Sequence, residues 1–127
     1  MKHPKLTLVA QGIAAVLLLI AAFQKFKGAS ADIGIFESLG MEPTGRYIVA
    51  IVEVLAGLLL LSPFAALGAF IAVAVMCGAL IAHVTQLGLI VNDDGGLLVG
   101  MLCVVLLFAD YVLISRRKEI PGIGSTL

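Results

Sequence analysis

The amino-acid sequence predicts an all-α integral membrane protein in which four transmembrane helices form one bundle and residues 1–127 form a single domain. Three observations support this prediction. Hydrophobic residues make up 61% of the chain. Charged residues make up only 13%, whereas a soluble domain has about 25%. The apolar residues also form runs of about 20 residues, which is the length that a helix needs to cross the ~30 Å hydrocarbon core.

Four spans are expected, over residues 6–24, 43–61, 64–89 and 97–115. Pro43 suits the start of the second span, because a first helical position does not need an amide hydrogen. The apolar sequence then continues almost to Ile90, which is too long for one crossing. Ser62-Pro63 is its only break, since proline disfavours helix at the residue before it. The cluster from Asn92 to Gly96 is a turn sequence that separates the last two spans.

The orientation follows from the distribution of basic residues. An even number of spans places both ends of the chain, residues 1–5 and 116–127, on one side, and these ends are rich in Lys and Arg. Such segments stay in the cytoplasm. We therefore expect cytoplasmic ends and an extracytoplasmic loop over residues 27–42, which can form a short interfacial helix carrying Ile33, Phe36 and Leu39.

Several function classes lack support. The net charge is zero and Trp is absent, so the chain offers neither a basic field nor a stacking platform for nucleic acid. Cys77 and Cys103 do not form the CxxC motif of dithiol exchange. We expect both to be buried as small hydrophobic residues, and a disulfide between them requires that their helices touch. One buried His and one Glu are too few for a zinc site, so no metal is expected.

Glu53 is the most informative residue, because it interrupts the apolar run from Tyr47 to Leu61. A carboxylate facing lipid costs about 2.5–3.5 kcal/mol on insertion scales, so it is retained where it faces protein or a wet cavity. From the rise per residue, Glu53 lies about 15 Å below the outer surface and His83 about 9 Å below it. With Lys25 at the outer end of the first span, these three residues are expected to converge. Residues close enough to join them are Gln24, Thr85 and Gln86.

Each member of this cluster also has a structural interpretation. Glu53 is a proton acceptor, a ligand anchor or only the counter-ion of Lys25, since buried polar networks can specify packing. His83 either exchanges protons near neutral pH or is a core histidine bonded to a backbone carbonyl or to Glu53. Lys25 can instead extend to the lipid headgroups. Asp110 is expected to be an interfacial acid, and Gln11 to bond to it or to a backbone group.

Small residues recur on one face of three spans, where they allow close helix packing in lipid. These faces contain Ala50, Glu53 and Gly57 on the second span, Gly68, Ala72, Ala79 and His83 on the third, and Gly96, Gly100 and Cys103 on the fourth. They predict a tight bundle or an interface between two copies of the chain, so a homo-oligomer is an open alternative.

Three segments resemble the DoxX family of small membrane proteins. Ala22-Phe23-Gln24-Lys25-Phe26 is similar to the end of the family's first helix, and Pro43 followed by Glu53-x-x-x-Gly57 resembles its second-helix signature. The segment from Met76 to His83 resembles its third-helix Ala-x-x-x-His element. The likeness extends from about Ala10 to Tyr111, although Gln11-Gly12 stands where members often carry Arg.

The resemblance implies a DoxX-like four-helix bundle that crosses the bacterial inner (plasma) membrane several times. It also implies a link to thiosulfate:quinone oxidoreduction and to membrane assemblies that handle thiol or oxidative stress. The family's Lys, Glu and His correspond to Lys25, Glu53 and His83.

The leading hypothesis is a component of a membrane oxidoreductase system that binds a quinone or another small amphipathic ligand. Its head group would lie at Lys25, Gln24, Glu53 and His83. Glu53 and His83 would relay protons as the candidate catalytic residues, and Lys25 would hold a carbonyl or an anion. The sequence contains no evident redox centre, so electrons would come from a membrane or soluble redox partner, and catalysis by the chain itself stays open. The alternatives are a non-enzymatic scaffold or chaperone subunit of a larger complex and, third, a small proton-coupled transporter.

Overall fold

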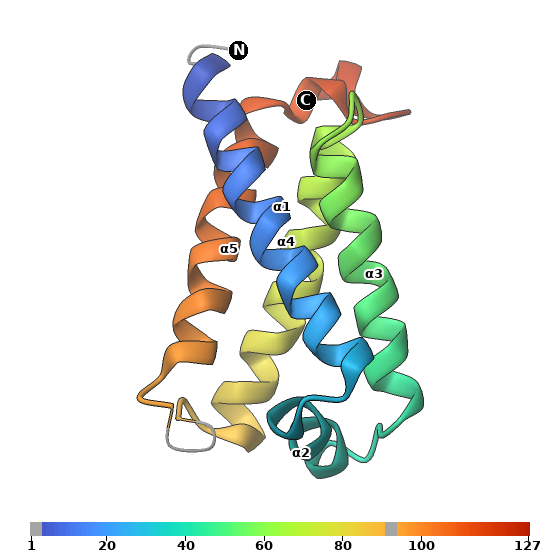
Figure 1. The fold of residues 1–127 in the computed structure, drawn as a ribbon. Coiled ribbons are helices and arrows are strands. Elements are labelled where there is room, and N and C mark those ends of the chain that lie inside the picture. The colour runs from blue at the N-terminus through green and yellow to red at the C-terminus, as the bar shows by residue number, and fades with distance from the viewer. Residues whose placement is uncertain (1–3, 91–93) are drawn as a thin grey trace.

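The computed structural model describes residues 4–90 and 94–127, and none of these residues is in a β-strand. They form five α-helices (Figure 1): α1 (Pro4–Lys27), α2 (Ser30–Ser38), α3 (Thr44–Leu60), α4 (Ala65–Ala82) and α5 (Leu97–Ser115). A π-helical turn, η1 (His83–Leu87), continues α4. Two short 3-10 turns, η2 (Arg117–Glu119) and η3 (Gly124–Thr126), follow α5. The all-α prediction is confirmed for the described residues.

Three helical segments are long and apolar enough to cross a membrane, namely α1, α4 continued by η1, and α5. The bounds of α5 match the fourth expected span, and α1 extends beyond residues 6–24 at both ends. The third segment runs from Ala65 to Leu87, slightly shorter than expected. α3 has 17 residues and begins at Thr44, so Pro43 lies just before the helix and not at its first position.

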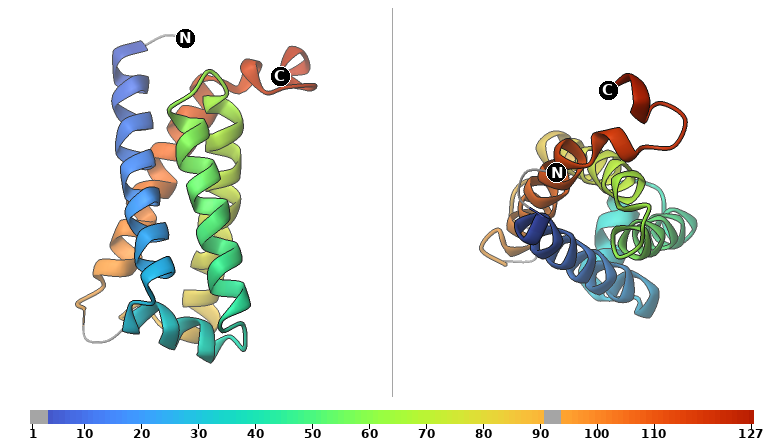
Figure 2. Two further views of the ribbon diagram at one scale, coloured as in Figure 1. Left: turned by 45° about the vertical axis from the view of Figure 1, so that its right-hand side comes forward. Right: turned by 90° about the horizontal axis from the view of Figure 1, so that it is seen from above.

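The four long helices lie side by side, with α1 and α4 each packed against both α3 and α5 (Figure 2). Both ends of the described chain and the α3–α4 turn lie at one end of these helices, and α2 lies across the other end (Figure 1). The core between them is built largely from alanine, including Ala14, Ala15, Ala56, Ala69 and Ala72. Small side chains allow backbones to approach closely, which is how helices associate where lipid removes the hydrophobic driving force.

α3 and α4 approach each other closely at Gly68. A Cβ atom placed on Gly68 would lie 2.7 Å from the Leu60 amide nitrogen and 2.9 Å from the Ala56 carbonyl oxygen. Both atoms belong to the backbone of α3, so no side-chain rotation could make room. The packing of α4 on α3 therefore requires glycine here, as the small-residue face predicted.

The outer surface of the helices is apolar on all sides. Exposed large hydrophobic residues come from every long helix, for example Phe23, Ile51, Ile81 and Leu107, which are 57–67% exposed. A soluble monomer rarely exposes such a continuous apolar surface. The exposed side chains therefore support a membrane environment, together with the three apolar helices.

The expectation that the two cysteines are buried is wrong. Cys77 and Cys103 are free and exposed, not buried. Cys103 and Gly100 belong to a face of α5 that the other helices do not cover. The buried face of α5 is instead formed by Leu102, Val105, Ala109 and Val112.

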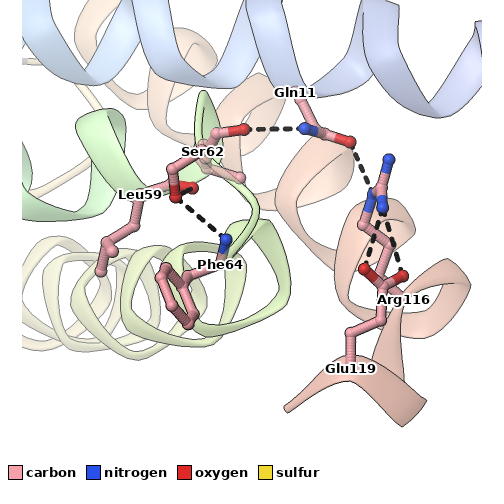
Figure 3. A network of polar contacts seen from close by, with 7 residues as sticks. Gln11, Leu59, Ser62, Phe64, Arg116 and Glu119 are labelled. Atoms are coloured by element: carbon pink, nitrogen blue, oxygen red, sulfur yellow. Dashed lines mark hydrogen bonds and ion pairs between the residues drawn. The ribbon is translucent and has the colours of Figure 1, made fainter. Parts of the chain in front are cut away.

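A polar network ties the helices together at the end near the chain termini (Figure 3). The Gln11 side chain is buried, and its Nε2 donates a hydrogen bond of 2.7 Å to the Leu60 carbonyl at the end of α3. Its Oε1 accepts a hydrogen bond of 2.7 Å from Arg116 Nε, and Arg116 also pairs with Glu119. Of the two partners expected for Gln11, the structure shows the backbone group and not Asp110.

The turn before α5 lies partly outside the described residues, because Asn92 and Asp93 are not among them. Within the described part, Gly95 and Gly96 have positive φ angles of 67° and 87°. The Asp94 carboxylate accepts hydrogen bonds from the amides of Gly96 and Leu98 at 2.8 Å and 3.0 Å. An acidic side chain thus satisfies free amides at the start of α5.

Candidate functional site

A cavity of about 410 Å³ lies at the α2 end of the helices. Its walls come from the last turns of α1, the early part of α3, the end of α4 and the first half of α5, and α2 lies at its end. Most of the lining is apolar, with side chains such as Leu18, Phe36, Met76, Met101 and Val105. Four ionisable side chains also line it: Lys25, Asp32, Glu53 and His83. An apolar pocket with a few polar groups is the usual form of a small-molecule site.

Lys25 and Glu53 meet in this cavity, as the sequence predicted. Lys25 Nζ lies 3.1 Å from Glu53 Oε1 and donates a hydrogen bond of 3.5 Å to Oε2. Glu53 is 2% exposed, and the Lys25 side chain is 13% exposed. Lys25 therefore points into the protein rather than toward the headgroups, and the carboxylate has the partner that its burial requires.

One oxygen of Glu53 still lacks a hydrogen-bond donor. Lys25 Nζ forms an ion pair with Oε1 at 3.1 Å, and its hydrogen bond goes to Oε2. Among the described residues, Oε1 is the one buried side-chain oxygen or nitrogen without a hydrogen-bond partner. Buried polar atoms are nearly always hydrogen-bonded in native proteins. This oxygen is therefore where a bound molecule would complete the site.

Asp32 was not expected at the site, because the sequence places it in a loop. It lies on α2, and Asp32 Oδ1 is 3.7 Å from Lys25 Nζ. Asp32 and Phe36 are the buried residues of α2, and both line the cavity. Residues four apart share one face of a helix, so the spacing of Asp32 and Phe36 was the signal that could have revealed this position.

Arg46 fixes the geometry around Lys25, and sequence reasoning also missed it. The residue is only 5% exposed, and its guanidinium bonds to the Glu42 carboxylate at 2.8–3.0 Å. It also donates a hydrogen bond to the Lys25 carbonyl oxygen and lies over the Tyr47 ring at 4.5 Å. The start of α3 is thereby attached to the end of α1. Lys25 is held at a fixed height opposite Glu53 as a result.

His83 lies on the cavity wall where α4 changes into the π-helical turn η1. It is 4% exposed, and its Nδ1 lies 3.0 Å from the Gly88 carbonyl oxygen. Of the two structural partners considered for His83, this is the backbone carbonyl and not Glu53. The turn that carries His83 ends at Gly88, whose φ of 79° is readily adopted only by glycine. The Gly88 amide in turn bonds to the His83 carbonyl at 2.7 Å.

The other three residues suggested for the cluster do not line the cavity: Gln24, Thr85 and Gln86. The Thr85 hydroxyl donates to the Ile81 carbonyl within its own helix.

Within residues 4–90 and 94–127, no three His, Cys, Asp or Glu side chains come together in a way that could hold a metal ion.

The chain matches no protein-family model, and neither a curated protein nor a solved structure matches it. The chemistry of the site must therefore be argued from its own residues. Two carboxylates share one ammonium, an imidazole lies on the same wall, and the remaining surface is apolar. This arrangement can hold a molecule with a polar head and an apolar body, and it can exchange a proton with that head.

Proposed function

We propose that this chain is a DoxX-like protein of the bacterial inner membrane that binds a quinone-like or other small amphipathic ligand between its helices, as a component of a membrane oxidoreductase system. One observation supports this proposal most. The apolar cavity contains a buried carboxylate, Glu53, with one oxygen that no described residue bonds. A buried ionisable group that faces a cavity in a membrane protein is a functional candidate by default.

The membrane topology is part of the proposal. α3 is the fourth span, because it packs between α1 and α4 and exposes Ile48, Ile51, Leu55 and Leu58 at 49–57%. Both ends of the chain lie in the cytoplasm, since Arg116, Arg117 and Lys118 follow the last span. The cavity then opens in the outer half of the membrane.

The chemical nature of the residues supports a quinone-like head group. A quinone takes up two electrons and two protons when it is reduced. Glu53 and His83 are two groups on the cavity wall that can exchange such protons, and general acid–base transfer requires a group within hydrogen-bond reach. Lys25 keeps the Glu53 carboxylate oriented, and the apolar side chains of α1, α4 and α5 exclude water from an isoprenoid or alkyl tail.

Binding of a decyl-substituted hydroquinone, the reduced form of a quinone-like ligand, to the protein in lipid nanodiscs tests this proposal. We expect Glu53→Gln and His83→Ala each to weaken binding at least tenfold. Gln24→Ala, one helical position from Lys25 but outside the cavity lining, is the matched control and should bind as the native chain does. Unchanged binding in both site variants would contradict the proposal.

A scaffold role has one specific observation in its favour. Lys25 is shared between Glu53 and Asp32, which is also the pattern of a buried network that fixes helix packing. On this reading, Glu53→Gln lowers the thermal stability in detergent without affecting any ligand, and a partner protein co-purifies with the native chain. The nanodisc binding experiment separates the two functions.

A further inference from the structure

We infer that the cavity selects a ligand whose head group is neutral and donates a hydrogen bond, such as a phenolic hydroxyl, over a head group that only accepts one. The inference deepens the proposed function and rests on it. It assigns a preference for the hydroxyl-bearing form of the ligand rather than the carbonyl form. It follows from the hydrogen-bonding capacity that the cavity wall leaves unused.

Glu53 supplies the first unused acceptor. An ionised carboxylate only accepts hydrogen bonds, and Glu53 Oε1 accepts none from the described residues although the residue is 2% exposed. A ligand carbonyl placed against this oxygen would put two acceptors together. A ligand hydroxyl would instead form a charge-assisted hydrogen bond, which is among the stronger kinds in proteins.

His83 supplies the second acceptor. Nδ1 lies 3.0 Å from the Gly88 carbonyl oxygen, and a carbonyl can only accept. Nδ1 must therefore carry the hydrogen in this contact. In a neutral imidazole the other nitrogen, Nε2, then has the free lone pair. Glu53 on α3 and His83 on η1 line the same cavity, and Nε2 is the ring nitrogen of His83 that is left as an acceptor.

The Lys25 ammonium already has two carboxylate partners. It bonds to Glu53 Oε2 at 3.5 Å and pairs with Asp32 at 3.7 Å. With two carboxylates to one ammonium, the cluster disfavours an anionic head group. A cationic head group at Glu53 Oε1 would be repelled by the Lys25 ammonium, which lies only 3.1 Å from that oxygen. A neutral donor meets neither repulsion.

Two matched probes test this inference, 4-decylphenol and 4-decylanisole. They share the ring and the tail, but the methyl ether of the anisole cannot donate. Binding of each to the full chain in nanodiscs, measured by native mass spectrometry with decylammonium as a third probe, gives the preference directly. We expect the phenol to bind at least tenfold more tightly than the anisole and than decylammonium.

The same ratio in two variants locates the selecting groups. In Glu53→Gln the new amide can donate as well as accept, so the phenol-to-anisole preference should fall to about twofold or less. His83→Ala should reduce it by a smaller factor. Gln24→Ala should retain the native ratio. If either site variant fails to fold, the ratio in the native chain still decides the inference.

The outcomes separate this inference from the proposed function. Equal binding of phenol and anisole overturns the selectivity but leaves an amphipathic ligand site in place. Tighter binding of decylammonium overturns it in favour of a cation site. Binding of none of the three probes overturns the proposed function and the inference together.

Discussion

Gln11 and Arg116 are 105 residues apart in the chain, and Arg116 Nε donates a hydrogen bond of 2.7 Å to Gln11 Oε1. Because Gln11 also bonds to the Leu60 carbonyl, this one side chain joins the first helix to the ends of the third and fifth. The contact, drawn in Figure 3, lies near the chain termini, at the opposite end of the helices from α2 (Figure 1). The cavity lies at the α2 end. The Gln11 contacts therefore hold the helices together at the end that is remote from the proposed ligand site.

Replacing Gln11 should therefore lower stability without affecting ligand binding. Gln11→Ala leaves the Leu60 carbonyl without its side-chain donor, and an unsatisfied buried group costs about 1–3 kcal/mol. We expect a lower melting temperature in detergent and unchanged binding of the decyl-substituted hydroquinone. Gln86→Ala, which removes an exposed glutamine, is the control. A Gln11→Ala protein as stable as the control would show that the network contributes nothing.

Gly68→Ala should be more destabilising than an alanine substitution at a helical glycine that has open space around it. The added methyl group would meet the α3 backbone at Leu60 and Ala56. Overpacking of this kind typically costs about 1–3 kcal/mol. Gly100→Ala is the matched control, because nothing lies within 4 Å of its added Cβ. Thermal unfolding in one detergent compares the two, and equal melting temperatures would contradict the close approach of α3 and α4.

Lys25 and Glu53 should be energetically coupled. Lys25→Met leaves the buried Glu53 carboxylate without its cation, and breaking a buried pair in this way costs roughly 3–5 kcal/mol. The double variant Lys25→Met/Glu53→Gln removes both charges and should recover much of that loss. Lys27→Met, two residues along and exposed, should have little effect. Additive losses in the double-mutant cycle would mean that the two side chains do not interact.

The membrane orientation can be tested with single cysteines. In a chain with Cys77→Ala and Cys103→Ala, we expect Ser38→Cys to react with a membrane-impermeant maleimide on intact spheroplasts. Ser125→Cys should react only after lysis, because the cytoplasmic side carries the basic chain end. Ser38 and Ser125 are both exposed, so neither variant should disturb the fold. The reverse labelling pattern would place α2 in the cytoplasm.

The positions of Lys25, Glu53 and His83 could be predicted from the sequence because burial of an acid in lipid requires a partner, and helix rise gives its depth. The bounds of α5 could be predicted because Gly96 precedes it and Arg116 follows it. Both predictions depend only on the position of a residue along its own helix.

Asp32 and Arg46 could not be placed in the same way. The position of Asp32 depends on how α2 folds back across the helix ends, and the sequence carries only a short, weakly patterned segment there. The position of Arg46 depends on where the start of α3 meets the end of α1. The exposed positions of Gly100 and Cys103 were missed for a related reason. A small-residue face indicates that close packing is feasible, but the partner of that face is decided by the shapes of the other helices.

The segment that carries Asp32 connects α1 to α3 between Gly28 and Gly40, both with positive φ. It places the Asp32 carboxylate beside the Lys25 ammonium and the Phe36 ring on the cavity wall. Adding or removing one residue in this connection would rotate the short helix by about 100°. A different side chain would then face the cavity. Homologues could thus acquire new ligand preferences through changes in loop length alone, with every transmembrane residue unaltered.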